Sequence, residues 1–318
     1  MLERDLRSRL AFFDKKHALL AQKPQRVQQG AREELLTALG GELHGRGASR
    51  FLKIEEPVDP NLFPGSPAEC VSPEAWFRLS GKSAPAGNHW VVLDTETTGL
   101  QTGAGTLVFL VGLLHWREED ARLVQYFIPE PAGESGMLRA LWRELEPADA
   151  LVSFNGLAFD CSRLRTRGIL SRLDPGMLDM PQLDLMHPAR RIAADWLPDC
   201  RLKSLEQSLL GREREDDLPG SEVPEVYRSW LSDGFQPDLP RVLEHNRHDV
   251  ENLMHLAAIL AAIYCDGEDP LVLPASAHHR LGRTLVARKR VGAARTRFER
   301  AMREGEEGIA CRAAFELA

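Results

Sequence analysis

An apolar run that ends in two closely spaced carboxylates sets the first constraint on this chain. The string WVVLDTETTGL (Trp90–Leu100) opens with four apolar residues, a pattern typical of a buried strand. Side chains alternate faces along a strand, so Asp94 and Glu96 project from the same side. Neighbouring carboxylates repel each other unless a positive charge separates them, and hard cations such as Mg2+ take oxygen ligands. The strand end therefore predicts a metal platform, although acidic pairs before a polar turn also occur on solvated strand ends.

Two later strings supply further acidic groups. LVSFNGLAFD (Leu151–Asp160) reads as a short strand, an Asn-Gly turn and the start of a helix at or near Asp160. The helix macrodipole alone favours an acid there, which is the simpler interpretation. LEHNRHDVENLMHLAAIL (Leu243–Leu260) carries apolar residues at helical spacing. It places His245 and Asp249 on one face, where they form either an exposed polar contact or part of a site.

The order of the three strings resembles the DEDD superfamily of 3′–5′ exonucleases, which have a ribonuclease-H-like fold. Asp-x-Glu on a first strand, Asn-x-x-x-Phe-Asp later and His-x-x-x-Asp on a late helix follow that pattern. The sequence from residue 88 to 264 resembles more closely the YprB-like family of bacterial proteins, also through the strings DLMHPARR and LKSLEQSLLG. The resemblance implies that two divalent ions, Mg2+ or Mn2+, are held by Asp94, Glu96, Asp160 and Asp249.

One position departs from the superfamily pattern. In one branch a tyrosine precedes the last aspartate by four residues, and in the other branch a histidine precedes it by five. Here His245 stands four residues before Asp249, so a histidine occupies the tyrosine position. An unperturbed histidine has a pKa of about 6.5 and can take a proton near neutral pH. We therefore predict that His245 orients or deprotonates the attacking water, and that the adjacent His248 is a surface or substrate-contacting residue.

Basic and polar residues near these strings are candidates for substrate contacts. Two arginine-rich runs, residues 163–172 and 190–214, follow Asp160. A basic flank beside a metal site can hold phosphates, but arginines on a helix are as often simply solvated. The candidate substrate-binding residues are Thr97, Asn155, Arg163 and Lys203.

The alternation of elements predicts an α/β fold, with a mixed sheet flanked by helices, as the ribonuclease-H-like resemblance implies. We expect an antiparallel meander, then a helix at residues 136–145, then a strand parallel to the first. The expected strands are residues 90–93, 106–116, 122–128 and 150–154. Residues 175–180 are expected to form a loop. Asp184 is interpreted as a helix cap, with a place behind the metal site as the alternative.

Three parts are expected along the chain. Residues 1–87 form a leader with helical patterns at 2–23 and 32–39, followed by a Pro- and Gly-rich stretch without a site. Residues 88–266 form the exonuclease domain, and residues 271–318 form an incomplete helical tail. The tail resembles a tetratricopeptide repeat at Leu281, Gly282, Leu285, Ala294, Phe298 and Ala301. A generic helical hairpin explains these positions nearly as well, and in either case the tail must dock on the nuclease domain or on a protein partner.

Composition is that of an ordinary globular protein, with 43% hydrophobic and 27% charged residues. No apolar run reaches the ~20 residues of a membrane helix, and the charged N-terminus lacks the apolar centre of a signal peptide. The five cysteines are scattered without a Cys-x-x-Cys pair. That spacing argues against a zinc site or a disulfide scaffold, and we expect a cytoplasmic protein with no membrane contact.

The predicted function is a two-metal nuclease, a 3′–5′ exonuclease acting on DNA or RNA. The net charge of −7 does not by itself indicate nucleic-acid binding. The alternative is a non-catalytic scaffold that binds nucleic acid or protein on a nuclease-like fold, and an endonuclease of this fold is a third possibility. Retention of all four acids favours catalysis, because uncompensated carboxylates held together destabilise a fold. The aromatic residues expected in the core, rather than stacked on bases, are Trp116, Phe154, Phe159 and Trp196.

Overall fold

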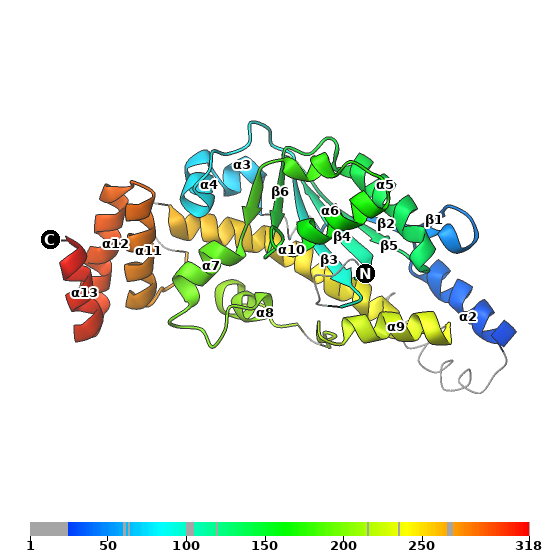
Figure 1. The fold of residues 1–318 in the computed structure, drawn as a ribbon. Helices are drawn as coiled ribbons and strands as arrows, with labels where there is room; N and C mark the ends of the chain where they lie inside the picture. The colour runs from blue at the N-terminus through cyan, green and yellow to red at the C-terminus, as the bar shows by residue number, and fades with distance from the viewer. Residues whose placement is uncertain are drawn as a thin grey trace.

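A mixed sheet of seven strands forms the centre of the protein (Figure 1), in the order β1-β2-β5-β4-β3-β6-β7. The computed structural model describes residues 25–317, with side chains from residue 30 onward. Gaps in that description fall at residues 60, 61, 63, 100–104, 119, 215, 235 and 266–269. The helix expected at residues 2–23 lies outside the described residues.

The middle of the sheet follows the predicted meander. Strands β3 (Trp90–Thr97), β4 (Val108–Trp116) and β5 (Ala121–Phe127) pair antiparallel in that order. Strand β6 (Ala150–Ser153) returns parallel to β3, and β7 (Gln182–Asp184) lies parallel to β6. Every residue of β4 is buried, as expected for a central strand covered on both faces. The predicted α/β class, with a mixed sheet flanked by helices, is confirmed.

Two strands that the sequence analysis did not anticipate come from the leader. Strand β2 (Phe51–Pro57) pairs antiparallel with β5, and β1 (Glu42–His44) pairs antiparallel with β2. Phe51, Leu52 and Ile54 of β2 are buried. This apolar pattern is short and adjoins a proline-rich stretch, so the sequence does not distinguish it as a strand. The sheet therefore runs across the boundary drawn at residue 87, while the division into folding units stays a prediction.

Helices cover both faces of this sheet. Short 3-10 turns occupy Gly47–Ser49, Pro131–Gly133 and Pro175–Asp179, the last within the expected loop. A π turn, Glu206–Leu210, extends α8. The helices are α2 (Gln25–Ala38), α3 (Pro67–Cys70), α4 (Pro73–Ser80), α5 (Glu134–Leu145), α6 (Asp160–Leu170), α7 (Met186–Ala193), α8 (Leu202–Leu205), α9 (Val223–Asp233) and α10 (Leu239–Tyr264).

The sheet separates two apolar cores, and β3 contributes alternate residues to each. Trp90 and Val92 join a core that includes Val250 and Leu253 of α10. Val91 and its alternating neighbours join the opposite core, which includes residues of α5 and α6. The side chains of β3 that follow Val92 on its face therefore point toward α10.

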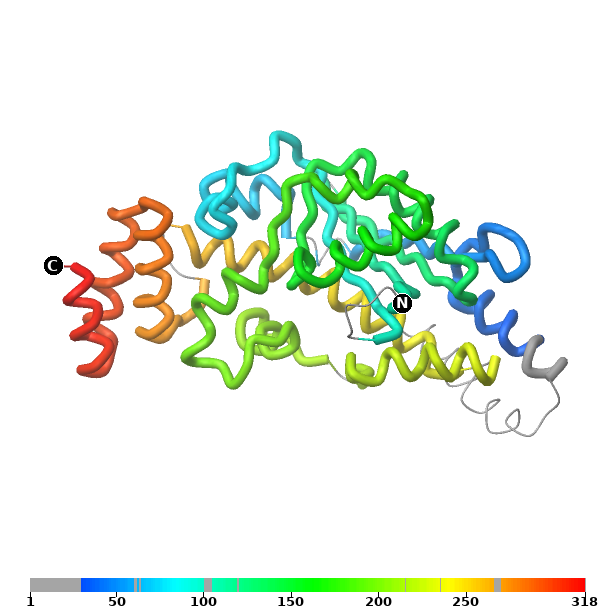
Figure 2. Tube along the Cα trace, in the orientation of Figure 1, coloured from blue at the N-terminus to red at the C-terminus, as the bar shows by residue number. Residues whose placement is uncertain are grey.

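The C-terminal helices α11 (Ala275–Ala287), α12 (Val291–Glu304) and α13 (Glu307–Leu317) form the expected helical tail. The tail lies beyond the end of α10 and beside α7 (Figure 2). Arginines attach it to the rest of the chain. Arg290 donates to Glu74 of α4 at 2.6 and 2.8 Å, and the buried Arg297 donates to the carbonyl of Ile263 at 2.7 Å. Assignment to the tetratricopeptide class and a protein partner for the tail stay predictions.

None of the described helices combines the length and the apolar character that a bilayer crossing requires.

Close packing of α11 on α12 gives a stability prediction. A Cβ at Gly282 would lie 2.5 Å from Cε1 of Phe298, whereas a Cβ at Gly292 would meet nothing within 4 Å. Gly282→Ala should therefore destabilise the tail by about 1–3 kcal/mol through overpacking. Gly292→Ala should be neutral or stabilising, by up to about 1 kcal/mol, because alanine favours the helix. Amide hydrogen exchange of α11 and α12 in the full chain measures both effects, and equal exchange in the two variants would contradict the packing.

Candidate metal centre

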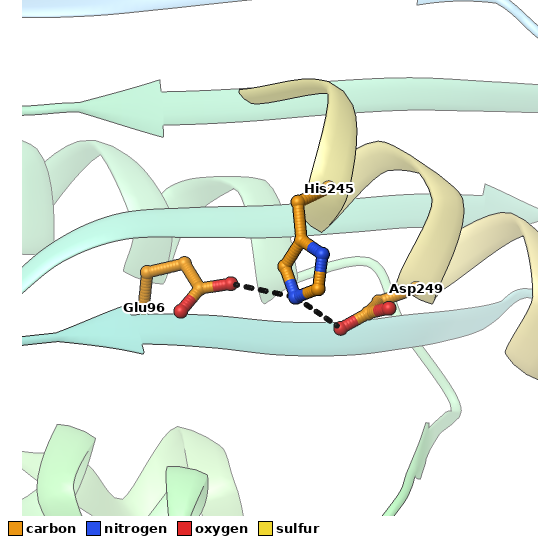
Figure 3. A group of neighbouring side chains, drawn as sticks. All are labelled: Glu96, His245 and Asp249. Carbon is orange, nitrogen blue, oxygen red and sulfur yellow. Dashed lines mark ion pairs between the residues drawn. The ribbon is translucent and has the colours of Figure 1, made fainter. Parts of the chain in front are cut away.

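Glu96 of β3 meets the polar face of α10. Its Oε1 lies 3.9 Å from Nε2 of His245, and Oδ2 of Asp249 lies 3.7 Å from the same nitrogen (Figure 3). One ligand atom from each of these three residues lies within 4.8 Å of the other two. Their side chains are only 13–15% exposed. The predicted sharing of one helical face by His245 and Asp249 is observed, and that face is turned toward β3.

Asp94 is held by a buried amide that the sequence analysis missed. Oδ2 of Asp94 accepts a hydrogen bond of 2.8 Å from Nδ2 of Asn246. The Oδ1 of Asn246 in turn accepts from Nε2 of Gln125 at 2.9 Å. Gly112, opposite Asp94 in β4, makes room for this chain of bonds, because a Cβ there would lie 2.2 Å from Oδ1 of Asn246. A glycine inside an otherwise apolar strand was the available signal of such a close approach.

Asp160 is anchored where α6 begins. Its Oδ1 accepts from the hydroxyl of Thr95 at 2.5 Å, so the strand residue between Asp94 and Glu96 ties α6 to β3. The turn before α6 is held by Asp184 at the end of β7. That carboxylate accepts from the backbone N–H groups of Asn155, at 2.8 Å, and of Leu157 and Met186. Asp184 therefore supports the first turn of α7 and also the turn that carries Asp160, while its place behind a metal site stays a prediction.

The cluster is short of positive charge. Burial raises the pKa of Asp94 well above its ordinary value, and the charges of Asp249 and Asp160 raise it further. Burial, and then Asp94, Asp249 and Asp160, raise the pKa of Glu96 in the same way. Burial also raises the pKa of Asp160 to about 6, against the lowering effect of its bond from Thr95. Carboxylate oxygens crowded together in a poorly solvated space are a donor set that fits hard divalent cations.

The loop after α8 supplies the counter-charge, also missed from sequence. Arg214, whose side chain is 5% exposed, donates from Nη2 to Oδ1 of Asp249 at 2.5 Å. It also forms a bidentate pair with the fully buried Glu206. Asp217 in the same loop lies with Oδ1 2.9 Å from Nδ1 of His245. Arg214 is therefore an internal cation of the site, not the exposed phosphate-binding arginine that its place in a basic run suggested.

Other arginines of the proposed basic flank are also engaged within the protein. Arg165 pairs with Asp179 at 2.6 Å and Arg167 pairs with Glu134. Arg191 donates to the carbonyl of Leu79 at 3.1 Å, and Arg212 donates to Oδ1 of Asn252 at 2.6 Å. These contacts engage part of the flank within the protein, whereas Arg172, Arg190, Arg201 and Lys203 are exposed. Contact of the flank with phosphates stays a prediction.

The four candidate substrate-binding residues occupy different settings. The buried Thr97 donates its hydroxyl to the carbonyl of Gly99 at 3.0 Å. Asn155 adopts a left-handed φ of 64° in the turn before Asp160. The guanidinium of Arg163, largely buried, lies 3.2 Å from the centroid of the Phe159 ring. Lys203 is exposed on α8. Their contacts with substrate stay predictions.

His248, another candidate, pairs with Glu244 one turn earlier in α10. The distance from Nε2 of His248 to Oε1 of Glu244 is 3.2 Å, and the His248 side chain is 34% exposed. The predicted core place of Trp116 is confirmed, and Phe154 and Trp196 are partly buried against the apolar core.

A mixed α/β sheet whose strand β3 carries carboxylates that face a long helix defines a ribonuclease-H-like protein with a nuclease-type fold. Residues 91–261 match the RNase_H_2 profile of the RNase H superfamily, which is more than half of the chain. The chain belongs to that superfamily.

A relative in Bacillus subtilis (strain 168), the uncharacterized protein YprB, is 34% identical over 171 residues. The match covers 53% of this chain but 41% of that protein, so the chain spans less than half of its relative. Among solved structures, a family B DNA polymerase from Pyrobaculum calidifontis is similar with a TM-score of 0.45 and 17% identity, over 71% of this chain and 30% of that one. E. coli exonuclease I in complex with a dT13 oligonucleotide is similar with a TM-score of 0.38 and 15% identity, over 54% and 40%. These TM-scores are low, and the family assignment rests on the sequence match.

The raised pKa of Asp160 gives a pH-dependent prediction. Its pKa is about 6 in the folded protein and about 3.9 in an unfolded chain, so the ionised form opposes folding and the protonated form does not. Asp160→Asn keeps an acceptor for Thr95 but removes the charge. In EDTA, its stability advantage over the unmodified protein should shrink by about 1 kcal/mol as the pH falls from about 7 to about 5. Urea unfolding measures the difference, and an advantage that does not change with pH would contradict the buried ionised carboxylate.

Proposed function

We propose that this protein is a metal-dependent nuclease that hydrolyses phosphodiester bonds, acting as a 3′–5′ exonuclease on DNA or RNA. Membership of the RNase H superfamily supports the proposal. The observation that carries it is a set of desolvated carboxylates on β3 and α6 near Asp249 of α10. Burial, with the charges of neighbouring carboxylates, raises the pKa values of Asp94, Glu96 and Asp160. Such a cluster costs stability unless cations join it, which is the usual signature of a functional site.

Each acid has a role in this proposal. Asp94, Glu96, Asp160 and Asp249 would hold two Mg2+ or Mn2+ ions, which would stabilise the charge that accumulates on the phosphoryl oxygens during displacement. Asn246 fixes the orientation of Asp94, and Thr95 fixes that of Asp160. Asp94 and Asp160 would therefore enter the reaction with their positions already set, which lowers the cost of organising the site.

His245 supplies proton transfer in this proposal. Its Nε2 faces the space between Glu96 and Asp249 and accepts a proton from the attacking water as the new P–O bond forms. The bond between phosphorus and the 3′ oxygen breaks, leaving a 3′-hydroxyl on the shortened strand and a 5′-phosphate on the released nucleotide. A histidine is suited to this step because its ordinary pKa of about 6.5 lies near neutral pH.

End-labelled oligonucleotides test the activity. Single- and double-stranded DNA and RNA, labelled at the 5′ end, should give ladders of products shortened from the 3′ end with Mg2+ or Mn2+, and none with EDTA. Asp94→Asn should lower the rate by about 10²-fold or more, because it removes one charged ligand from the transition state. Asp120→Asn, in the exposed hairpin between β4 and β5, serves as the control and should not change the rate. Cleavage that persists in EDTA, or no cleavage of any substrate, would contradict the proposal.

Thermal unfolding tests metal binding separately from hydrolysis. Mn2+ binds the folded protein and should stabilise it by about 2.7 kcal/mol at a concentration 100 times its Kd. Glu96→Gln should reduce this stabilisation. In EDTA the same variant should unfold at a higher temperature than the unmodified protein, because it removes one of several repelling, desolvated charges. An unmodified protein whose stability does not respond to Mn2+ or Mg2+ would favour a non-catalytic scaffold.

A further inference from the structure

The two ring nitrogens of His245 face chemically different surroundings. Nδ1 lies 2.9 Å from Oδ1 of Asp217, in the loop after α8. Nε2 points the other way, toward Glu96 and Asp249 at 3.9 and 3.7 Å (Figure 3). The function of the ring depends on which of these nitrogens carries the proton, because only the unprotonated one can accept a proton or bind a cation.

The contacts at Nδ1 decide the tautomer. An ionised carboxylate only accepts hydrogen bonds, so a proton on Nδ1 gives a good bond to Asp217, whereas a bare Nδ1 would place two lone pairs face to face. Nη1 of Arg214 also lies near Nδ1, but at 3.5 Å, and a guanidinium can only donate. The shorter contact with the anion is the stronger of the two. A neutral His245 ring therefore carries its proton on Nδ1 and has its lone pair on Nε2.

Asp217 is itself held firmly as an anion. Its side chain is 4% exposed, and its Oδ2 lies 3.5 Å from Nη1 of Arg214. The pKa of Asp217 is lowered against the effect of burial, by the bond with His245 and by the charges of Arg214 and Lys203.

The backbone around Asp217 is fixed by bonds to α10. Arg241 donates to the carbonyl of Asp216 at 2.9 Å, and Arg212 bonds Asn252. These bonds hold the loop against the face of α10 that carries His245 and Asp249. Asp217 is therefore a rigid partner for Nδ1.

We propose that Asp217 is a positioning residue for His245, holding the imidazole as the Nδ1–H tautomer with the Nε2 lone pair aimed between Glu96 and Asp249. The catalytic use of that lone pair rests on the proposed function, while the tautomer does not. During hydrolysis the water proton moves to Nε2, the Nδ1 proton stays in place, and Asp217 remains a carboxylate bonded to the imidazolium. Asp217 thus acts through His245 and does not touch the reacting atoms.

Gly220, in the loop that carries Asp217, lies next to Nε2 of His245. A Cβ at this position would lie 3.4 Å from Nε2 of His245 and 3.8 Å from Cε1, with no other atom within 4 Å. Gly220→Ala therefore fits the fold without clash but places a methyl group beside the lone pair. It should obstruct the attacking water and leave the tautomer unchanged, which separates access to Nε2 from its orientation.

Nitrogen NMR of the histidine rings in metal-free protein tests the tautomer directly. His245 is assigned by the signal that disappears in His245→Gln. The unmodified protein should show the Nδ1–H form, and Asp217→Ala should shift it toward the Nε2–H form or a mixture. Asp216→Asn is the matched control, since it removes a neighbouring exposed charge at a left-handed residue that asparagine tolerates, and it should change nothing. An Nε2–H ring in the unmodified protein, or one unaffected by Asp217→Ala, would overturn the proposal.

Kinetics test the consequence. Asp217→Ala and the closer isostere Asp217→Asn should lower kcat by about 10²-fold or more, with little change in KM, because they remove oriented proton transfer and not substrate binding. Stabilisation by Mn2+ should persist in both variants. An unchanged kcat in both variants, or a loss of Mn2+ stabilisation that accompanies the loss of kcat, would overturn the positioning role. If the unmodified protein shows the Asp217-dependent tautomer but hydrolyses no substrate, the proposed function is wrong and the tautomer assignment is still supported.

Discussion

Repulsion among carboxylates that have little water around them is the constraint on which the site depends. Asp94, Glu96 and Asp160 are all harder to ionise than in an open chain, and the largest cause is burial. Charge of this kind is retained in a fold only when neighbouring groups compensate it. Arg214 offsets part of it at Asp249, and the amide of Asn246 offsets part at Asp94. In the proposed function, divalent cations neutralise the negative charge that these two groups leave uncompensated.

The fold brings this charge together through ordinary packing. Alternate residues of β3 enter the core beneath α10, so the next residues on that face, Asp94 and Glu96, meet α10 where its surface becomes polar. Asn246 reaches Asp94 across 152 positions of sequence because Gly112 leaves a gap in β4. Apolar packing on both faces of the sheet thus holds the acidic residues in position against their mutual repulsion.

Elements with a regular pattern could be predicted from the sequence. The alternation in β3 placed Asp94 and Glu96 on one face, and the four-residue spacing in α10 placed His245 with Asp249, because strand and helix periods fix side-chain direction. Asp217 and Arg214 could not be found in this way. They lie in a loop without periodicity, and their partners stand 28 and 35 residues away. Charge alone misled the interpretation of Arg214, since a sequence does not show whether an arginine meets solvent or a buried acid.

Anomalous diffraction from a crystal soaked in Mn2+ would show whether the four acids bind metal. We expect two manganese peaks among the oxygens of Asp94, Glu96, Asp160 and Asp249, with Nδ1 of His245 still bonded to Asp217. A map without manganese at these residues would contradict this proposal.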